Sequence, residues 1–305
     1  MIRLCVEPKA TGIPWEQFKG TKNAIALDGY VYGKPQFNSE APSANFNHHE
    51  EVDRLSTRAT CSQVLVAVRQ GLLHRFRDAQ GINLTVYVND CDQDVCLSWF
   101  ILKNSWMTGN SVNPALNRLV HIEDMMDTCA GAYPFNKDLP ILEKVSWVFE
   151  PYTKFRLNGG LDRKNADDFR SVIEDVEKRI MAHITGDGGA VKLDTEYEVL
   201  QSNMVWALIK ETGKDARSVL SADGIKAFVS ARERPDKNWT YTIGKVSAYV
   251  DFDVKGILEA LNSVEENSVD KWGGSDMVGG SPRYAGSKLS PVRVAEVINS
   301  YIHDR

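Results

Sequence analysis

The feature that most constrains the fold is an alternation of strand-like and helix-like segments, with polar residues where the strand-like segments end. The apolar run "NAIALDG" stops at Asp28-Gly29, and the β-branched run "INLTVYVNDCDQD" opens into acids. Apolar residues at helical spacing occupy residues 59–76, 95–104 and 117–131. This order is typical of a doubly wound sheet, so we predict an α/β fold with a mainly parallel sheet.

The length of the chain indicates two domains or one large α/β domain, because 305 residues exceed what one small core serves. We expect an α/β domain over residues 1–160 and a smaller α/β domain over residues 191–305. Between them, residues 161–190 contain a charged amphipathic helix, with an apolar stripe at Phe169, Val172, Ile173, Val176 and Ile180. We interpret this helix as a connector between the domains.

Composition excludes some classes of function. The net charge is −5 and no block of Lys or Arg occurs, which argues against binding long duplex nucleic acid but permits a small phosphorylated substrate. The beginning of the chain lacks the apolar stretch of a signal peptide, and no run reaches membrane-spanning length. Five scattered cysteines without a CxxC pair indicate reduced thiols, with Cys91 and Cys96 as packing residues. We therefore expect a cytoplasmic protein that does not enter a membrane.

Two adjacent histidines stand out in "NFNHHEEVDR", where His48 and His49 follow Asn47. The chain has six histidines in all, so an adjacent pair needs an explanation. A solvated polar turn would explain an isolated pair. Acids elsewhere in the chain favour a second explanation, a site that binds a metal ion.

These acids are Asp90, Asp92 and Asp94, which alternate where a strand-like run meets a helix-like run. A calcium loop of the EF-hand kind does not fit, because Val95 and Ile101 occupy the positions that need Gly and Glu. A solvated acidic turn remains open. Like charges packed at a strand end repel one another, and a divalent cation relieves that repulsion. Asp and His together suit Mn²⁺ or Mg²⁺.

The same residues resemble the DHH phosphoesterase superfamily, which contains metal-dependent nucleases, pyrophosphatases and phosphodiesterases. Asp28 at a strand end, followed by "NHH", is similar to two of its motifs, and "DCDQDVCLS" and "MMDTCAG" are similar to two others. The chain departs from the family at Asn47, where the signature has Asp, and at Val88, where it often has His. The D-x-D stretch also follows the histidine pair instead of preceding it. These departures leave open a site with two ions, one ion or none.

The predicted site draws on distant parts of the chain. Bridging carboxylates and one imidazole would hold the metal, namely Asp28, His48, Asp92, Asp94 and Asp127. His49 would face the substrate as the catalytic residue, stabilising developing charge or donating to the leaving oxygen. Because Asp28, His48, Asp92 and Asp94 each follow a predicted strand, we expect these four to converge at one edge of the sheet. Roles for Asn47, Asp90, His121 and Asp124 stay open between the surroundings of the metal and a solvated surface.

A glycine-rich stretch, "WGGSDMVGGSPR", lies where the DHH superfamily has a substrate loop. Its glycines permit backbone N–H groups to turn toward an anion, while Ser281 and Arg283 add a hydroxyl group and a guanidinium. We expect Gly279, Gly280, Ser281 and Arg283 to bind the substrate's phosphate. A merely flexible loop is the alternative.

The function that these expectations favour is metal-dependent hydrolysis of a phosphate ester in a cleft between the domains. The substrate would be a small phosphorylated molecule, a nucleotide or a short oligonucleotide. The alternative is a catalytically silent relative that binds a nucleotide or a partner without turnover. A processive nuclease fits less well, because the chain is acidic and lacks a basic channel with aromatic residues. The sequence leaves the oligomeric state open.

Overall fold

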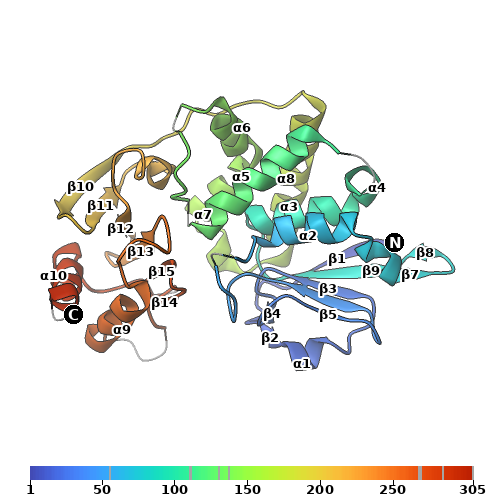
Figure 1. The fold of residues 1–305 in the computed structure, drawn as a ribbon, viewed down its shortest axis with the longest axis horizontal. Coiled ribbons are helices and arrows are strands. Elements are labelled where there is room, and N and C mark those ends of the chain that lie inside the picture. Colours follow the sequence, from blue (N-terminus) through green and yellow to red (C-terminus); the bar gives the residue numbers. More distant parts are fainter. Residues whose placement is uncertain are drawn as a thin grey trace. The chain divides into compact units, whose positions relative to one another are not determined.

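The structure is a computed structural model, and it describes residues 1–54, 56–109, 112–129, 131–136, 138–266, 270–283 and 285–303. The chain divides into two compact units (Figure 1). The first unit comprises Met1–Asp127 and Pro140–Lys192, and the second comprises Thr128–Leu139 and Leu193–Arg305. The chain therefore leaves the first unit at Asp127, returns to it, and leaves again at Lys192.

A five-stranded sheet organises the first unit, in the order β1-β9-β3-β6-β5. Four strands are parallel, namely β1 (Ile2–Val6), β9 (Leu84–Val88), β3 (Ala24–Leu27) and β6 (Ser43–Phe46). Only the edge strand β5 (Gln36–Asn38) is antiparallel. The expected α/β class is confirmed. Parallel strands place Asp28, Asn47 and Asn89 just beyond the same edge of the sheet.

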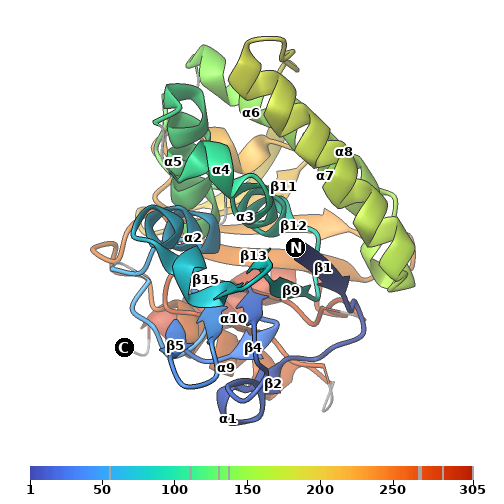
Figure 2. The same ribbon diagram turned by 90° about the vertical axis from the view of Figure 1, so that its right-hand side faces the viewer.

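The two faces of this sheet are covered unequally. The long helices α2 (Thr60–Arg69), α3 (Gln93–Lys103) and α8 (Ala166–Thr185) lie on one face (Figure 1 and Figure 2). The other face carries the short helix α1 (Trp15–Phe18) and the paired strands β2 (Ile13–Pro14) and β4 (Val31–Tyr32). There Phe18 packs against Ala24 and Ala26 of β3. A doubly wound fold has long helices on both faces of its sheet. In the described part of this unit, the long helices cover one face only.

Helix α3 is the core of this helical layer, because every residue from Asp94 to Leu102 is buried. Helix α2 packs beside it, and α2 ends at Arg69 instead of continuing to residue 76 as the sequence predicts. Gly71, with φ +91°, interrupts it, and the 3-10 helix η1 (Leu72–Phe76) follows. The remaining elements of the unit are α4 (Ser105–Thr108), α5 (Pro114–Thr128), α6 (Pro140–Val148), α7 (Glu150–Leu157), η2 (Leu161–Arg163), β7 (Arg77–Asp78) and β8 (Gly81–Ile82).

Helix α8 belongs to the first unit and is not the connector that its sequence suggested. It begins where the Asn165 side chain accepts hydrogen bonds from the N–H groups of Asp167 and Asp168, at 2.9 and 3.1 Å. Its apolar stripe packs against α3, α6, α7 and β1, and Phe169 and Ile180 are completely buried. A stripe buried within one unit contributes to that unit's core.

The second unit has a six-stranded sheet in the order β10-β11-β12-β13-β15-β14. Its strands are β10 (Tyr197–Ser202), β11 (Ala207–Glu211), β12 (Ala227–Glu233), β13 (Trp239–Lys245), β15 (Val278–Gly280) and β14 (Gly273–Gly274). Only β11 and β12 are parallel. Helices α9 (Val254–Val264) and α10 (Pro291–His303) contribute Ile257 and Ile298 to its core, and the 3-10 helix η3 (Ala216–Val219) follows β11.

Two expectations from composition can be compared with this fold. All five cysteines are free thiols, and Cys91 and Cys96 are buried, as predicted for packing residues. Among the helices of the described ranges, none has both the length and the apolar character needed to cross a membrane.

Candidate metal centre

Four elements of the first unit bring histidines and acids together. Asp28 follows β3 in a left-handed conformation, with φ +49°, and its N–H donates to the carbonyl of Phe46 at 2.9 Å. His48 and His49 follow β6. Asp94 lies in the first turn of α3, and Asp127 lies near the end of α5. Residues separated by up to about a hundred positions thus meet at the carboxyl edge of the sheet.

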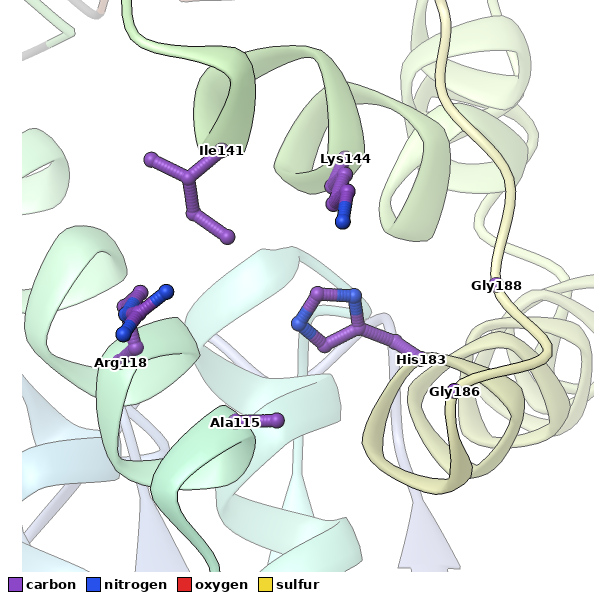
Figure 3. Close-up of a pocket in the computed structure, with 7 residues that line it drawn as sticks. All are labelled: Ala115, Arg118, Ile141, Lys144, His183, Gly186 and Gly188. Carbon is purple, nitrogen blue, oxygen red and sulfur yellow. The ribbon is translucent and has the colours of Figure 1, made fainter.

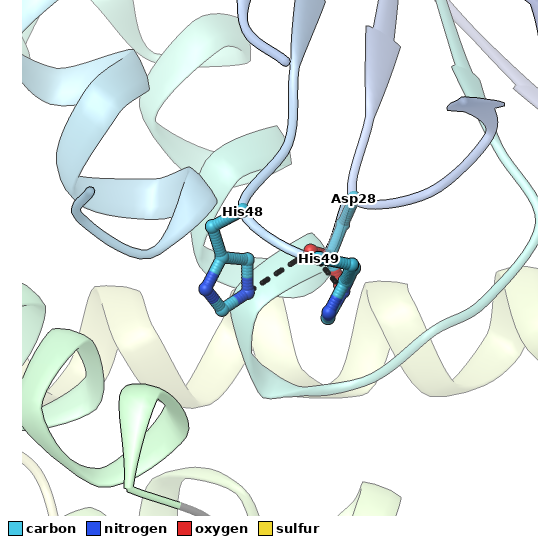
Figure 4. A group of neighbouring side chains, drawn as sticks. All are labelled: Asp28, His48 and His49. Carbon is cyan, nitrogen blue, oxygen red and sulfur yellow. Dashed lines mark ion pairs between the residues drawn. The ribbon is translucent and has the colours of Figure 1, made fainter. Parts of the chain in front are cut away.

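His48 is at the middle of this cluster. Its Nε2 atom lies 2.7 Å from Oδ2 of Asp127, 3.4 Å from Oδ1 of Asp28 and 3.7 Å from Oδ2 of Asp94. His49 Nε2 lies 2.9 Å from the same oxygen of Asp28, and Figure 4 shows both rings directed at that carboxylate. Two sets of three residues could each hold an ion, Asp28–His48–His49 and His48–Asp94–Asp127, with ligand atoms within 4.8 Å of one another.

Two buried atoms of this cluster, Nε2 of His48 and Oδ2 of Asp127, lie 2.7 Å apart as an ion pair, and neither makes a hydrogen bond to any other described group. A buried pair without further partners leaves part of its polar capacity unused, which is uncommon. Two ligands of an octahedral Mg²⁺-like ion, each about 2.1 Å from it, are about 3 Å from each other. The spacing of this pair therefore fits two ligands of one divalent cation.

Charge in the cluster is unbalanced toward the carboxylates. Burial raises the pKa of Asp28, but His49 and His48 outweigh it and hold that pKa well below its usual range. Burial, with Asp28 and Asp127, raises the pKa of Asp94 to about 7. Nearby carboxylates contribute to this rise in pKa. An added cation would therefore stabilise the charged form of the carboxyl group.

Arg54 contacts both histidines from the side opposite the acids. Its guanidinium donates to Nδ1 of His48 at 3.1 Å and to Nδ1 of His49 at 3.0 Å. A guanidinium has no acceptor, so each Nδ1 must be the acceptor and the ring proton lies on Nε2. Burial lowers the pKa of His48, but Asp127 and Asp28, which face Nε2, raise it by more, to about 10. These carboxylates favour the imidazolium form, whereas Arg54 opposes the proton on Nδ1 that this form requires. A second proton on Nδ1 would set two donors against each other.

Asn47 positions the histidine pair and is not oriented as a metal ligand. Its side-chain oxygen accepts from the N–H groups of His48 and His49, at 2.8 and 3.2 Å. Its amide nitrogen donates to the carbonyl of Gly33 at 3.1 Å and to Glu50 at 2.6 Å. A carboxylate at position 47 would face these acceptors without a proton to donate. Asn at this position is therefore explained by the turn that it holds.

Asp94 and Asp124 also cap helix α2, whose own N-cap residue makes no side-chain hydrogen bond. The two Asp94 oxygens accept from the N–H groups of Thr60 and Cys61, at 2.7 and 2.5 Å. Asp124 accepts from Ala59 N–H at 2.6 Å. Helix N-termini stabilise anions through such donors. Asp124, whose role the sequence left open, thus has a structural one, and Asp94 has two roles.

Three other predicted residues lie outside both sets of ligands. Asp92, expected as a ligand, is the N-cap of α3 and accepts from Val95 N–H at 2.9 Å. Burial, and then Asp28 and Asp90, raise the pKa of Asp92 well above its usual range, so it is electrostatically part of the cluster. Asp90 accepts from Cys91 N–H at 2.7 Å, and His121 is exposed on α5. Asp90 and Asp92 thus hold the turn that starts α3, and of the alternating acids Asp94 is the one in a ligand set.

Sequence reasoning missed Arg54, Thr60 and Glu123. The Thr60 hydroxyl group donates to Oδ1 of Asp28 at 3.0 Å. Glu123 is 2% exposed, and burial, with Asp127 next in effect, raises its pKa well above the usual range. Its position one helical turn before Asp127 was a usable signal. Arg54 was visible as the first cation after the histidine pair.

The four glycines of the glycine-rich stretch lie in the paired strands β14 and β15, and Ser281 and Arg283 follow β15 outside a strand. Gly279 and Gly280 lie in β15, which pairs with β13 on one side and β14 on the other. A Cβ at Gly279 would lie 2.5 Å from Cδ1 of Leu258, so close packing of α9 explains this glycine. Ser281 exchanges hydrogen bonds with the backbone of Tyr241, at 3.0 and 3.1 Å, and Arg283 N–H donates to Asp270 at 3.0 Å. The backbone of this stretch is used by the second unit's sheet.

The cluster in the first unit offers nitrogen and oxygen ligands, the set that suits Mn²⁺ or Mg²⁺. Such an ion would be enclosed by protein on the side of His48 and Asp94, which are 0% and 1% exposed. It would be accessible on the side of Asp127 and His49, whose side chains are 29% and 36% exposed. Compared with known proteins, the chain matches no protein-family model and no curated protein.

Proposed function

We propose that this protein is a metal-dependent phosphoester hydrolase with one divalent cation, Mn²⁺ or Mg²⁺, held by His48, Asp127, Asp28 and Asp94. The observation that carries the proposal is the buried ion pair of His48 Nε2 and Asp127 Oδ2, 2.7 Å apart, whose two atoms make no hydrogen bond to any other described group. Two further carboxylates within 4 Å of the same nitrogen complete a first set of ligands. The proposed relationship to the DHH phosphoesterases agrees with this set of ligands.

The protein's own groups have separate tasks in this reaction. When bound, the cation supplies Lewis acidity toward a phosphoryl oxygen and an activated water at neutral pH. His49 is more exposed than His48, so it is the imidazole that a substrate would reach. Its Nδ1 accepts from Arg54 and its Nε2 proton faces Asp28, so stabilising the phosphoryl group or protonating the leaving oxygen would require that proton to turn from Asp28 to the substrate. Asn47 fixes the backbone of both histidines.

The substrate class follows from charge and size. A net charge of −5 disfavours a long polyanion, so we propose a small phosphorylated molecule, a nucleotide or a short oligonucleotide. Five free thiols suit a reducing compartment, and we propose the cytoplasm. The proposal assigns no substrate contact to Arg283, because the glycine stretch before it is paired in a sheet.

A second candidate is a non-catalytic protein that binds a nucleotide or a partner at the same residues. Arg54 favours it, since a metal-bound imidazole ordinarily donates its Nδ1 proton, and Arg54 can only donate. Asn47 in place of a carboxylate removes one further ligand. In this alternative the cluster is a set of buried ion pairs that needs no cation.

Titration of the purified protein with Mn²⁺, and hydrolysis of bis(p-nitrophenyl) phosphate, separate the two candidates. We expect His48→Ala to weaken Mn²⁺ binding at least about tenfold, and His49→Ala to bind Mn²⁺ normally while losing about 10²–10⁴ in rate. His74→Ala, an exposed histidine of η1, is the matched control and should change neither. Mn²⁺ binding without hydrolysis of any phosphate ester would support the second candidate. Absence of Mn²⁺ binding would contradict the metal centre itself.

A further inference from the structure

A separate cavity of about 140 Å³ opens in the helical layer of the first unit (Figure 3). Its walls come from three helices: Ala115 and Arg118 of α5, Ile141 and Lys144 of α6, and His183 of α8. The segment 186–188, which follows α8, closes one side. None of these residues is among the ligands of the candidate metal centre.

The polar groups of this cavity are basic. His183 is 9% exposed, and Figure 3 shows its ring projecting from α8 into the space between Arg118, Ile141 and Lys144. Its buried Nε2 atom makes no hydrogen bond with any described group. Burial first, then Lys144 and Arg118, lower the pKa of His183, which indicates that both cations act on the ring. Neutral His183 can present a single N–H to the cavity.

The two cations are not neutralised by the protein. Within the described ranges, neither Arg118 nor Lys144 forms an ion pair or a side-chain hydrogen bond, whereas other cations of this unit, such as Lys103 and Arg179, pair with acids. Asp187, the acid just after α8, instead accepts a hydrogen bond from the Thr185 hydroxyl group at 3.1 Å. Two cations that converge on a buried, unsatisfied imidazole constitute a site built for an anion.

Glycines hold this arrangement in place. Gly186 has φ +94° and ends α8. The chain then folds back so closely that a Cβ at Gly188 would lie 2.9 Å from Cα of His183. A side chain at position 188 would therefore displace the helix end that carries His183.

We propose that this cavity binds an oxyanion of the phosphate class, either inorganic phosphate or the phosphoryl group of a small phosphomonoester. A tetrahedral anion can accept from three directions at once, here from the Arg118 fork, the Lys144 ammonium group and the His183 imidazole. A water molecule needs about 10–15 Å³ of such volume, so the cavity has room for a phosphoryl group and a small organic portion. The site goes beyond the proposed hydrolase function and does not depend on it.

Calorimetric titration with inorganic phosphate tests the site, with EDTA present so that phosphate bound through a metal ion does not contribute. Arg118 and Lys144 are exposed on their helices, so Arg118→Gln and Lys144→Gln should fold normally. We expect each to weaken phosphate binding by about tenfold or more, the usual value of a charge-assisted contact. Arg77→Gln, which removes one exposed positive charge from the same unit, is the control and should change binding by less than about twofold. His48→Ala should bind phosphate like the wild type, which separates this site from the metal centre.

Further titrations identify the ligand class. Glycerol 3-phosphate that binds more tightly than inorganic phosphate would identify a phosphomonoester, and the reverse order would identify free phosphate. Acetate that binds as tightly as phosphate would overturn the phosphate class. Absence of saturation by roughly 10 mM phosphate, or equal losses in Arg77→Gln and Arg118→Gln, would overturn the site itself.

Discussion

Arg54 contacts both histidines of the candidate metal centre and determines which of their nitrogens carries the proton. Because it donates to both Nδ1 atoms, the Nε2 protons face Asp28 and Asp127. A cation at Nε2 of His48 needs that nitrogen's lone pair, and the ring proton must then move to Nδ1. Nδ1–H and the guanidinium are both donors, so no hydrogen bond can form between them. Arg54 therefore opposes metal binding both by its charge and by its hydrogen bonds.

We predict that Arg54→Gln raises the affinity for Mn²⁺ by about tenfold. The substitution removes a positive charge close to the cation, and the Gln carbonyl can accept from Nδ1–H. Titration calorimetry with Mn²⁺ measures the change. Arg58→Gln, an exposed cation that contacts Ser62 at 3.4 Å, is the control. Weaker Mn²⁺ binding in Arg54→Gln would mean that Arg54 supports the ligands, and it would contradict a ring proton on Nε2 of the histidines.

At the scale of the element, the strands β14 and β15 show how one composition permits two structures. Glycines at 273, 274, 279 and 280 suggest a loop, yet they form paired strands against α9. Gly279 is buried and adjoins Leu258, whereas Gly273 is exposed with no atom within 4 Å of an added Cβ. The two glycines thus have different reasons to be glycine, although they belong to adjacent pairs of the same hairpin, Gly273–Gly280 and Gly274–Gly279.

We predict that Gly279→Ala destabilises the protein by about 1–3 kcal/mol, because the new methyl group overpacks the contact with α9. Gly273→Ala should change the free energy of unfolding by no more than about 0.5 kcal/mol. Urea denaturation of both variants measures the difference. Similar losses at the two positions would contradict the packing explanation and restore the idea of a loop that needs glycine for its backbone.

At the scale of the whole molecule, one acid whose side chain is 9% exposed links folding to pH. Glu211 in the second unit forms ion pairs with Arg217 at 3.0 Å and Arg232 at 2.9 Å. Burial raises the pKa of Glu211, but Arg217 and the other partners lower it by more, so the net shift is downward. A carboxyl group with a lower pKa in the folded state contributes stability above its unfolded value of about 4.3, and this stability is lost as pH falls through the folded pKa.

We predict that Glu211→Gln lowers the free energy of unfolding by about 1–3 kcal/mol at pH 7, with a smaller difference from the wild type as pH falls below about 4.3. Urea denaturation across this range measures the dependence. Glu198→Gln, an exposed acid of β10, is the control and should show no such convergence. A difference that is the same at every pH would show that packing, and not charge, is what Glu211 contributes.

The sequence by itself determined the class of fold and the region of the site. Periods of two and of 3.6 residues mark strands and helices locally, and parallel strands end at one edge, so Asp28 and His48 could be expected to meet. Cys91 and Cys96 were likewise readable as packing residues, because no partner cysteine or metal motif accompanies them.

Only the tertiary structure decided which neighbouring side chains face the site. Asp92 and Asp94 are two positions apart, yet one caps its own helix and the other reaches His48 and the end of α2. The apolar stripe of α8 could have joined two domains or completed one core. Its contacts with α3, α6, α7 and β1 show that it completes the core of the first unit. The physical reason is that periodicity records how polar each face of an element is, while the identity of the opposing surface depends on contacts between residues far apart in the chain.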